Sequence, residues 1–272
     1  MPALLTNLKS DLIEIALAAG RKIQEIVAEG FSTTHKADSS TLTDADMAAN
    51  ELIIRRLQAA YPEVLVVSEE GKQYCGAGLE TGDWFIVDPL DGTRGFANGS
   101  KEYTVNIALI RNGIAVAGVI FAPALGELYY GEIENGAIFV KVAGGIIGDE
   151  IAITAQKLQS PVHLLVSRHH LGGRTKEFVH KFESPKITQM NSSIKLCKIA
   201  AGVGDIYPRF GPTSQWDIAA GQAILEAAGG KVLQMNGAAF SYGKVDENGT
   251  LLINPDFVAC GDFRPSFLPF PE

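Results

Sequence analysis

The 272-residue sequence predicts a mixed α+β and α/β protein, with an antiparallel sheet behind two N-terminal helices and a smaller α/β layer towards the C-terminus. Apolar residues recur at helical spacing near the N-terminus, and short β-like runs separated by turn signals follow. Strand and helix patterns then alternate over the last third of the chain. A chain of this length buries a large core, and we expect two domains, residues 1–150 and 151–272.

Each predicted element in the first half depends on its own pattern. The first helix, residues 5–29, carries apolar side chains on one face and is closed by Gly30. The second helix, residues 45–60, is followed by Pro62, and turn signals such as Arg111-Asn112-Gly113 separate the strands that follow. These strands are predicted at 64–68, 84–88, 103–110, 114–121, 127–131 and 137–140.

The Gly-rich stretch at residues 143–148 is predicted to be a loop close to the domain boundary. It is not a phosphate-binding P-loop, because no Lys and Ser/Thr follow at the required spacing. The α/β layer comes after it. Its strands are predicted at 162–166, 204–208, 231–234 and 251–253, and its helices at 174–182, 193–201 and 217–228.

The composition restricts the partners and the compartment. A net charge of −8 argues against DNA or RNA, which need a basic face, but it is compatible with a small phosphorylated ligand held through metal ions. The cysteines, Cys75, Cys197 and Cys260, follow no zinc spacing and indicate a reducing compartment. The longest uncharged apolar stretch, residues 114–125, is too short to span a membrane. We expect a cytoplasmic protein without a transmembrane segment, and leave open its oligomeric state and a loose association with the inner membrane.

The segment Asp88-Pro89-Leu90-Asp91-Gly92-Thr93 is the most informative part of the sequence. It follows the apolar run 84–87, so a turn at a strand's end carries two carboxylates and the Leu90 carbonyl. Hard oxygen ligands of this kind suit Mg²⁺. The N–H groups of Gly92 and Thr93 are expected at a helix start, where an anion is favoured. A type I turn with a capping Asp is the alternative interpretation.

Further acidic residues lie at the ends of predicted elements. Glu69-Glu70 follows the strand 64–68, Asp44 and Asp46 lie at the start of the second helix, and Asp217 opens a later helix. Each has a structural alternative, because Asp46 and Asp217 also favour a helix dipole and Glu69-Glu70 also fits a solvated turn. Their shared position at element ends indicates a common metal site more strongly than any one of them does.

These motifs resemble the inositol monophosphatase superfamily of Mg²⁺-dependent, lithium-sensitive phosphatases. The resemblance depends on Glu69-Glu70, Asp88 to Thr93 and Trp216-Asp217-Ile218-Ala219-Ala220-Gly221, in that order, and covers nearly the whole chain. It implies a layered αβαβα sandwich of the sugar-phosphatase type that binds two or three Mg²⁺ ions. The implied metal ligands are Glu69, Asp88, the Leu90 carbonyl, Asp91 and Asp217, and Asp46 and Thr93 match the positions that hold and orient the attacking water.

The implied chemistry explains these residue types. Phosphate monoesters hydrolyse extremely slowly without help, so electrostatic stabilisation is essential. Two Mg²⁺ ions can cover both ends of an in-line displacement. Thr93, backed by Asp46, would position the water and provide a route for its proton.

The second half of the chain indicates which ester is hydrolysed. Inositol monophosphatases typically have a small or apolar residue where Lys195 stands and an acid near Arg209, and here both positions are basic. Two cations suit a second phosphate rather than a sugar hydroxyl. The pattern resembles the 3'(2'),5'-bisphosphate nucleotidases, a subgroup that residues 104–110 and 207–212 also resemble. Arg94 stands where this subgroup often has Lys, which keeps the charge.

The subgroup resemblance implies an enzyme of sulfate assimilation that converts adenosine 3',5'-bisphosphate to AMP and phosphate. Activity on 3'-phosphoadenylyl sulfate stays open. The alternatives are hydrolysis of inositol monophosphate or fructose 1,6-bisphosphate, and a non-catalytic nucleotide or metal sensor on the same scaffold.

The same resemblance implies a set of substrate contacts. Ser192, Lys195 and Arg209 would hold the 5'-phosphate and ribose, and His170 matches a nucleotide-contacting position. From the residues alone, a plain helix cap for Ser192 and a solvated helix face for Lys195 are equally good interpretations. The full set of implied substrate contacts is Glu69, Leu90, Asp91, Gly92, Thr93, His170, Ser192, Lys195, Arg209 and Asp217.

Overall fold

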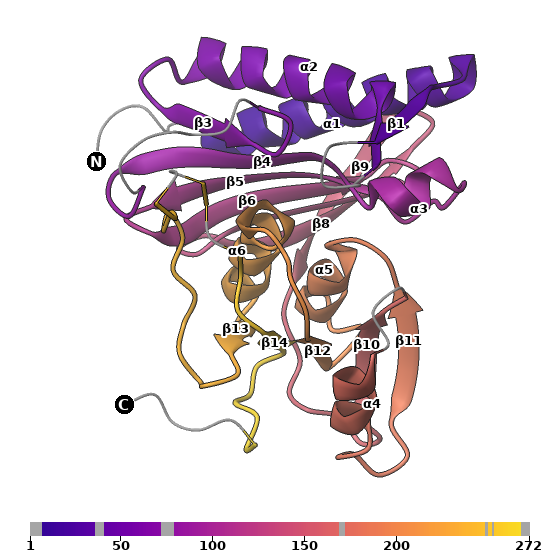
Figure 1. The fold of residues 1–272 in the computed structure, drawn as a ribbon, viewed down its shortest axis with the longest axis vertical. Coiled ribbons are helices and arrows are strands. Elements are labelled where there is room, and N and C mark those ends of the chain that lie inside the picture. Colours follow the sequence, from indigo (N-terminus) through magenta and orange to yellow (C-terminus); the bar gives the residue numbers. More distant parts are fainter. Residues whose placement is uncertain are drawn as a thin grey trace.

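In a computed structural model of the chain, helices and sheets alternate in five layers (Figure 1). The structure describes residues 7–35, 41–71, 79–168, 172–247, 250–251 and 253–267. From the top of Figure 1 the layers are a helix pair, a seven-stranded sheet, a second helix pair, a five-stranded sheet and a single helix. The αβαβα sandwich expected from the sequence is therefore confirmed.

The first layer consists of α1 (Leu8–Glu29) and α2 (Asp44–Ala60), which agree with the two predicted N-terminal helices. The apolar stripe of α1, including Leu12 and Ile23, is buried against α2 and one face of the large sheet. A capping box starts α2, because the Thr43 side chain accepts from the backbone of Asp46 and the Asp46 carboxylate accepts from the backbone of Thr43.

The seven-stranded sheet has the order β3-β4-β5-β6-β7-β8-β9. Only β3 and β4 are parallel, and every later neighbour is antiparallel, so the predicted meander is confirmed. Its strands are β3 (Leu65–Ser68), β4 (Asp83–Asp91), β5 (Thr104–Arg111), β6 (Ile114–Ala122), β7 (Glu127–Glu132), β8 (Gly136–Ala143) and β9 (Ile146–Ile153).

The loop predicted at residues 143–148 is confirmed only for Gly144 and Gly145, and the residues on either side of them belong to strands. Gly144 and Gly145 adopt φ values of 56° and 80° and form a tight turn that joins β8 to β9. The strand β9 was not predicted, because it is an edge strand whose side chains are almost all exposed and therefore show no alternation of apolar and polar residues.

The five-stranded sheet has the order β11-β10-β12-β14-β13. Of the strand predicted at 251–253, Leu251 forms an isolated bridge with Val245, Ile253 is in no strand, and residue 252 lies outside the described residues. The chain pairs as β14 further on. The edge strand β11 and the short β1–β2 pair were not predicted. The strands are β10 (His163–Ser167), β11 (Lys186–Met190), β12 (Ile206–Arg209), β13 (Lys231–Gln234) and β14 (Phe257–Cys260), with β1 (Thr33–His35) and β2 (Thr41–Thr43) outside both sheets.

The helices α5 (Ile194–Ala200) and α6 (Ala219–Ala227) lie between the two sheets and share their core. Close contact of α6 with the large sheet needs Gly118, where a β-carbon would lie 2.5 Å from the Ala220 carbonyl oxygen. This contact places the N-terminus of α6, and the 3₁₀ turn before it (η2, Gln215–Asp217), near β4 and β5.

The outer helix α4 (Gly173–Val179) packs on the far face of the small sheet. Cys197 and Cys260 are buried free thiols, and Cys75 lies outside the described residues. No helix in the described part of the chain is both long and apolar enough to cross a membrane. The expected boundary between residues 150 and 151 stays a prediction.

Candidate active site

The end of β4 carries the first part of the site. The strand does not stop at residue 88, as predicted, but runs on to Asp91, and its register with β5 shifts between Asp88 and Asp91. The Asp88 side chain is 1% exposed and accepts a hydrogen bond from the Leu90 N–H at 3.0 Å. The proline and the register shift thus present two carboxylates from one strand end at the same place.

Asp217 reaches this strand end from the second half of the chain. It closes η2 in a capping box with Ser214, whose N–H donates to the Asp217 carboxylate at 2.8 Å. The carboxylates of Asp88, Asp91 and Asp217 offer oxygen atoms that lie within 4.8 Å of one another. Asp217 therefore both caps η2 and belongs to the acidic cluster.

The electrostatics of this cluster indicate a cation. Burial raises the pKa of Asp88 well above its usual value, and the charges of Glu69, Asp91 and Asp217 raise it further. Burial, followed by the charge of Asp91, raises the pKa of Asp217 to about 8. Burial also raises the pKa of Asp91, against the lowering effects of Lys195 and the Ser193 N–H. Three mutually repelling carboxylates with hard oxygen donors fit a divalent ion such as Mg²⁺.

Two other expected metal ligands border the cluster. The charge of Glu69 raises the pKa of both Asp88 and Asp217. Glu69 directly follows β3, the strand that pairs with β4. The Leu90 carbonyl accepts a hydrogen bond from the Thr93 hydroxyl at 2.8 Å. Both groups therefore border the acidic cluster.

A second polar pair lies beside the cluster. The Thr93 hydroxyl is 3.1 Å from the Asp46 Oδ1 atom, and the other carboxylate oxygen of Asp46 accepts from the Thr43 N–H at 2.8 Å. Asp46 is only 2% exposed, and this burial raises its pKa, although the hydrogen bonds from Thr43 and Thr93 lower it. The cap of α2 therefore also fixes the carboxylate that faces Thr93.

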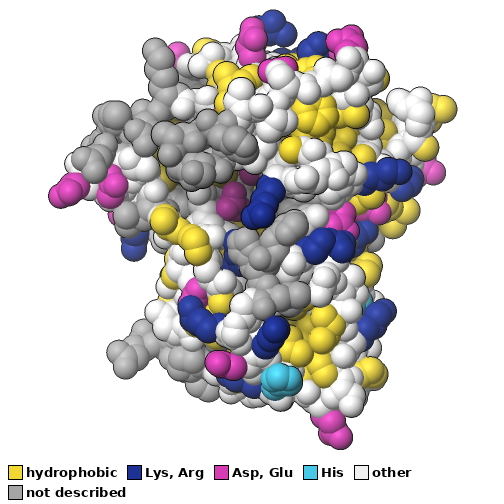
Figure 2. Space-filling view, turned by 45° about the vertical axis from the view of Figure 1, so that its right-hand side comes forward, with side chains coloured by type: hydrophobic (Ala, Val, Ile, Leu, Met, Phe, Trp, Pro, Cys, Tyr) yellow, Lys and Arg dark blue, Asp and Glu magenta, His cyan; other side chains and the backbone are white. Residues whose placement is uncertain are grey.

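A cavity of about 160 Å³ adjoins the cluster and lies between the two sheets. Figure 2 shows basic and acidic side chains side by side in the hollow between the upper and lower halves of the molecule. Gly92, at the N-terminus of α3 (Thr93–Ala97), also lines the cavity. The charged side chains that line it are Asp91, Arg94, Lys195, Arg209 and Asp217, and the hydroxyl side chains are Ser167, Ser192, Ser193, Tyr207 and Thr213.

Lys195 is 3% exposed, so the interpretation of a solvated helix face is wrong. Its ammonium group donates to the carbonyls of Met190 and Ser192 and lies 4.9 Å from the centre of the Tyr207 ring. Burial lowers the pKa of Lys195 to about 8, against the raising effect of Asp91. Arg209 is 9% exposed, and its Nε atom has no hydrogen-bond partner among the described residues.

The residues before α5 serve more than one purpose. Ser193 is the N-cap of α5, but its hydroxyl bonds to Thr104 and Asn106, both at 2.8 Å, and its N–H donates to the Asp91 carboxylate. Ser192 has a φ of 55°, which is unusual for a residue other than glycine. The plain-cap interpretation therefore does not describe these serines.

One expected contact, His170, and Arg94, which stands where the subgroup often has Lys, have different outcomes. His170 lies outside the described residues. Arg94 is exposed and lines the cavity. The sequence analysis assigned no site role to Glu102, Asn106 or Tyr207. Glu102 and Asn106 meet the site through Asn191 and Ser193, which are far away in the chain, and Tyr207 lines the cavity beside Lys195.

The model of the inositol monophosphatase family matches residues 8–258. The chain belongs to this family. The family resemblance read from the motifs is thus confirmed.

Curated relatives of this chain within the inositol monophosphatase family include proteins of one name from several bacteria. The chain is 36% identical over 233 residues to the 3'(2'),5'-bisphosphate nucleotidase CysQ of Buchnera aphidicola, covering 85% of this chain and 86% of that protein. It is 34% identical over 231 residues to the protein of the same name from Escherichia coli strain K12, covering 84% and 91% of the two chains.

Solved structures of the family agree with the fold. The crystal structure of CysQ from Bacteroides thetaiotaomicron matches with a TM-score of 0.79 and 34% identity, covering 94% of this chain and 97% of that one. An IMPase from Thermotoga maritima matches with a TM-score of 0.73 and 23% identity, covering 92% and 90%. The second likeness bears on the fold alone.

Proposed function

We propose that this protein is a Mg²⁺-dependent 3'(2'),5'-bisphosphate nucleotidase that hydrolyses adenosine 3',5'-bisphosphate to AMP and phosphate. The observation that carries the proposal is the pairing of two buried cations, Lys195 and Arg209, with the carboxylates of Asp91 and Asp217 in one cavity. A metal site and a second anion site adjoin there, as a bisphosphate requires. The name of the CysQ relatives supports the same substrate.

The acidic cluster is the proposed metal site. Asp88, Asp91 and Asp217, with Glu69 and the Leu90 carbonyl, would hold two or three Mg²⁺ ions. Bound Mg²⁺ would supply Lewis-acid stabilisation of the phosphoryl oxygens and lower the pKa of a bound water. The protein would hold these ligands in place before the substrate binds, because β4 is buried in the core and Trp216 of η2 packs against the core.

Thr93 and Asp46 form the proposed proton route. The Thr93 hydroxyl lies within hydrogen-bond distance of both the Asp46 carboxylate and the Leu90 carbonyl. With its proton directed at either acceptor, the Thr93 oxygen keeps a lone pair that can accept a hydrogen bond from the attacking water. The water would give its proton to the Thr93 oxygen while the Thr93 hydroxyl passes its own proton to the Asp46 carboxylate, which would be the final acceptor.

Lys195, Arg209 and Ser192 would bind the phosphate that does not react. Arg209 and Lys195 both line the cavity, and the buried Nε atom of Arg209 has no hydrogen-bond partner among the described residues. An arginine fork and a lysine point charge together suit a dianionic phosphate. A phosphate beside Lys195 would also raise its pKa from about 8, so the ammonium form would be favoured when substrate is bound.

The same site would accept 3'-phosphoadenylyl sulfate, because the bulk added by the sulfate lies on the non-reacting side. We place the enzyme in sulfate assimilation and in the cytoplasm, and expect lithium to inhibit it. These statements extend the proposal and share its test.

Phosphate release from adenosine 3',5'-bisphosphate, inositol 1-phosphate and fructose 1,6-bisphosphate, each with and without Mg²⁺, tests the proposal. We expect Mg²⁺-dependent turnover with the highest kcat/KM for adenosine 3',5'-bisphosphate. A preference for either sugar phosphate would replace the nucleotide assignment, and no turnover of any of the three would favour a non-catalytic sensor.

A further inference from the structure

A short backbone segment, Asn191-Ser192-Ser193, joins β11 to α5 and lines the cavity; we call it the serine loop. Two carboxylates from the other half of the molecule hold its backbone. Asp91 accepts a hydrogen bond from the Ser193 N–H, and the Oε2 atom of Glu102 accepts one from the Asn191 N–H at 3.0 Å. The loop is thus tethered at both ends to the segment around β4 and β5.

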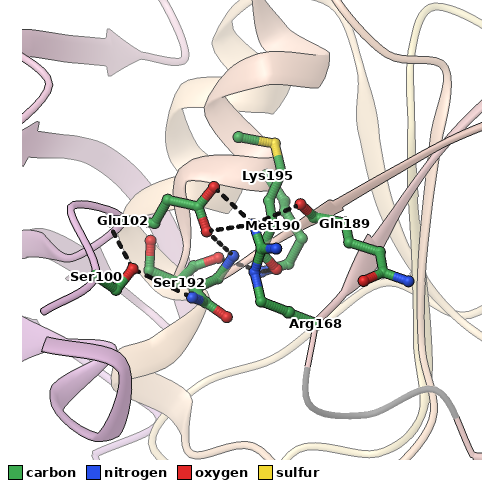
Figure 3. A network of polar contacts seen from close by, with 8 residues as sticks. Ser100, Glu102, Arg168, Gln189, Met190, Ser192 and Lys195 are labelled. Carbon is green, nitrogen blue, oxygen red and sulfur yellow. Dashed lines mark hydrogen bonds and ion pairs between the residues drawn. The ribbon is translucent and has the colours of Figure 1, made fainter. Parts of the chain in front are cut away.

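Glu102 itself is held in place by a small network, which Figure 3 shows together with Lys195. The guanidinium of Arg168 donates to both carboxylate oxygens of Glu102 at 3.2 Å and to the Gln189 carbonyl at 3.1 Å. The Ser100 hydroxyl accepts from the Glu102 N–H at 3.1 Å and from the Asn191 side-chain amide at 3.4 Å. Glu102 therefore has a defined orientation although it is not fully buried.

The opposite side of the same loop holds Lys195. The ammonium group of Lys195 donates to the carbonyl of Ser192 and to that of Met190, which lies just before the loop. Ser192 has a positive φ, a conformation that persists only where surrounding contacts impose it. The position of the Lys195 charge thus depends on a strained loop, and the loop depends on its tethers.

We propose that Glu102 is a positioning residue for the phosphate that does not react: through the Asn191 N–H it fixes the serine loop and thereby Lys195. This inference depends on the proposed nucleotidase function. The other tether, Asp91, belongs to the acidic cluster, so a bound ion competes for its carboxylate. Glu102 is not a member of that cluster and holds the loop whether or not an ion is bound.

The contribution of Glu102 to substrate binding is expected to be specific to the phosphate that does not react. Loss of the tether weakens binding of the non-reacting phosphate and leaves the acidic cluster and Thr93 unchanged. The effect is therefore expected in KM for a bisphosphate and not in kcat. A nucleoside 3'-monophosphate, which lacks the second phosphate, provides the internal comparison.

The experiment compares Glu102→Ala, Glu102→Gln and the control Glu14→Ala, which removes an exposed carboxylate and its ion pair with Arg56 far from the cavity. KM and kcat are measured with adenosine 3',5'-bisphosphate and with 3'-AMP in Mg²⁺. We expect Glu102→Ala to raise KM for the bisphosphate about 10-fold, with kcat and the 3'-AMP parameters within about 2-fold. Glu102→Gln keeps an oxygen that accepts from Asn191, so KM should rise less than about 3-fold.

The rate of amide hydrogen exchange over residues 186–194 measures how firmly the tether holds the serine loop, and this measurement does not depend on turnover. We expect exchange about 10-fold faster in Glu102→Ala than in the wild type, and near wild-type exchange in Glu102→Gln and Glu14→Ala. Unchanged KM for the bisphosphate in Glu102→Ala overturns the proposal, as does an equal rise for both substrates or equal damage by the Gln variant. If the wild type does not hydrolyse the bisphosphate, the proposed function fails instead, and unchanged exchange in Glu102→Ala then refutes the tether separately.

Discussion

Replacing Asp217 with Asn is predicted to stabilise the metal-free protein while weakening its response to Mg²⁺. In the folded protein the pKa of Asp217 is about 8, because the side chain is desolvated and faces Asp91. The amide of Asn cannot ionise, but it keeps an oxygen that accepts a hydrogen bond from the Ser214 N–H, so the cap of η2 is retained. The change therefore removes repulsion without removing the structural contact.

The size of the effect follows from linkage. An unfolded Asp has a pKa of about 3.9. Each unit by which the pH exceeds this value, up to the folded pKa, destabilises the folded protein by about 1.4 kcal/mol, so the upper bound of the destabilisation by Asp217 at pH 7 is about 4 kcal/mol. Asp217 is partly exposed, so solvent screening reduces the gain to about 1–2 kcal/mol, or a Tm rise of about 3–6 °C. Because the folded pKa is raised, this destabilisation is absent below about pH 4 and grows as pH rises towards 8.

Thermal unfolding in a metal chelator at pH 5, 6, 7 and 8 measures the effect. The control is Asp149→Asn, which removes the same charge at an exposed position of β9. We expect the Tm gain of Asp217→Asn to grow with pH and the control to stay within about 1 °C of the wild type. With Mg²⁺ added, the wild type should gain stability and the variant much less. A lower Tm for the metal-free variant at pH 8, or a gain independent of pH, would refute the reasoning.

Three further predictions concern turnover and folding. Asp91→Asn is expected to reduce kcat by more than about 100-fold and to abolish the Tm shift with Mg²⁺; a preserved Tm shift would show that the ion binds elsewhere. Lys195→Ala should mainly raise KM for adenosine 3',5'-bisphosphate, about 10–100-fold, and an unaffected KM would remove the main physical support for a bisphosphate substrate. Thr93→Val should lower kcat at least about 100-fold with Thr93→Ser near the wild type, and equal loss in both would exclude the hydroxyl as the acting group.

Much of the fold was predictable because its elements leave a local pattern. The buried stripe of α1 and the turn signals between β5 and β6 report burial and chain reversal within a few residues. The exposed edge strands β9 and β11 lack that signal, since nothing buries one of their faces. Pairing across a sheet edge depends on a partner strand and not on the strand's own periodicity.

The candidate site likewise has one part that the sequence predicts and another part that only the tertiary structure determines. The identity of the acidic side chains, their order and the family were determined by the sequence, since Asp88 and Asp91 share one strand end and the motifs are contiguous. The meeting of Asp217 with them, the burial of Lys195 and the tether from Glu102 to Asn191 were decided only by the tertiary structure. Glu102 and Asn191 are 89 residues apart, and packing between distant segments leaves no mark in local sequence. Short-range spacing sets which groups a strand end or helix cap presents, whereas burial and charge environment arise only when the two sheets close around α5 and α6.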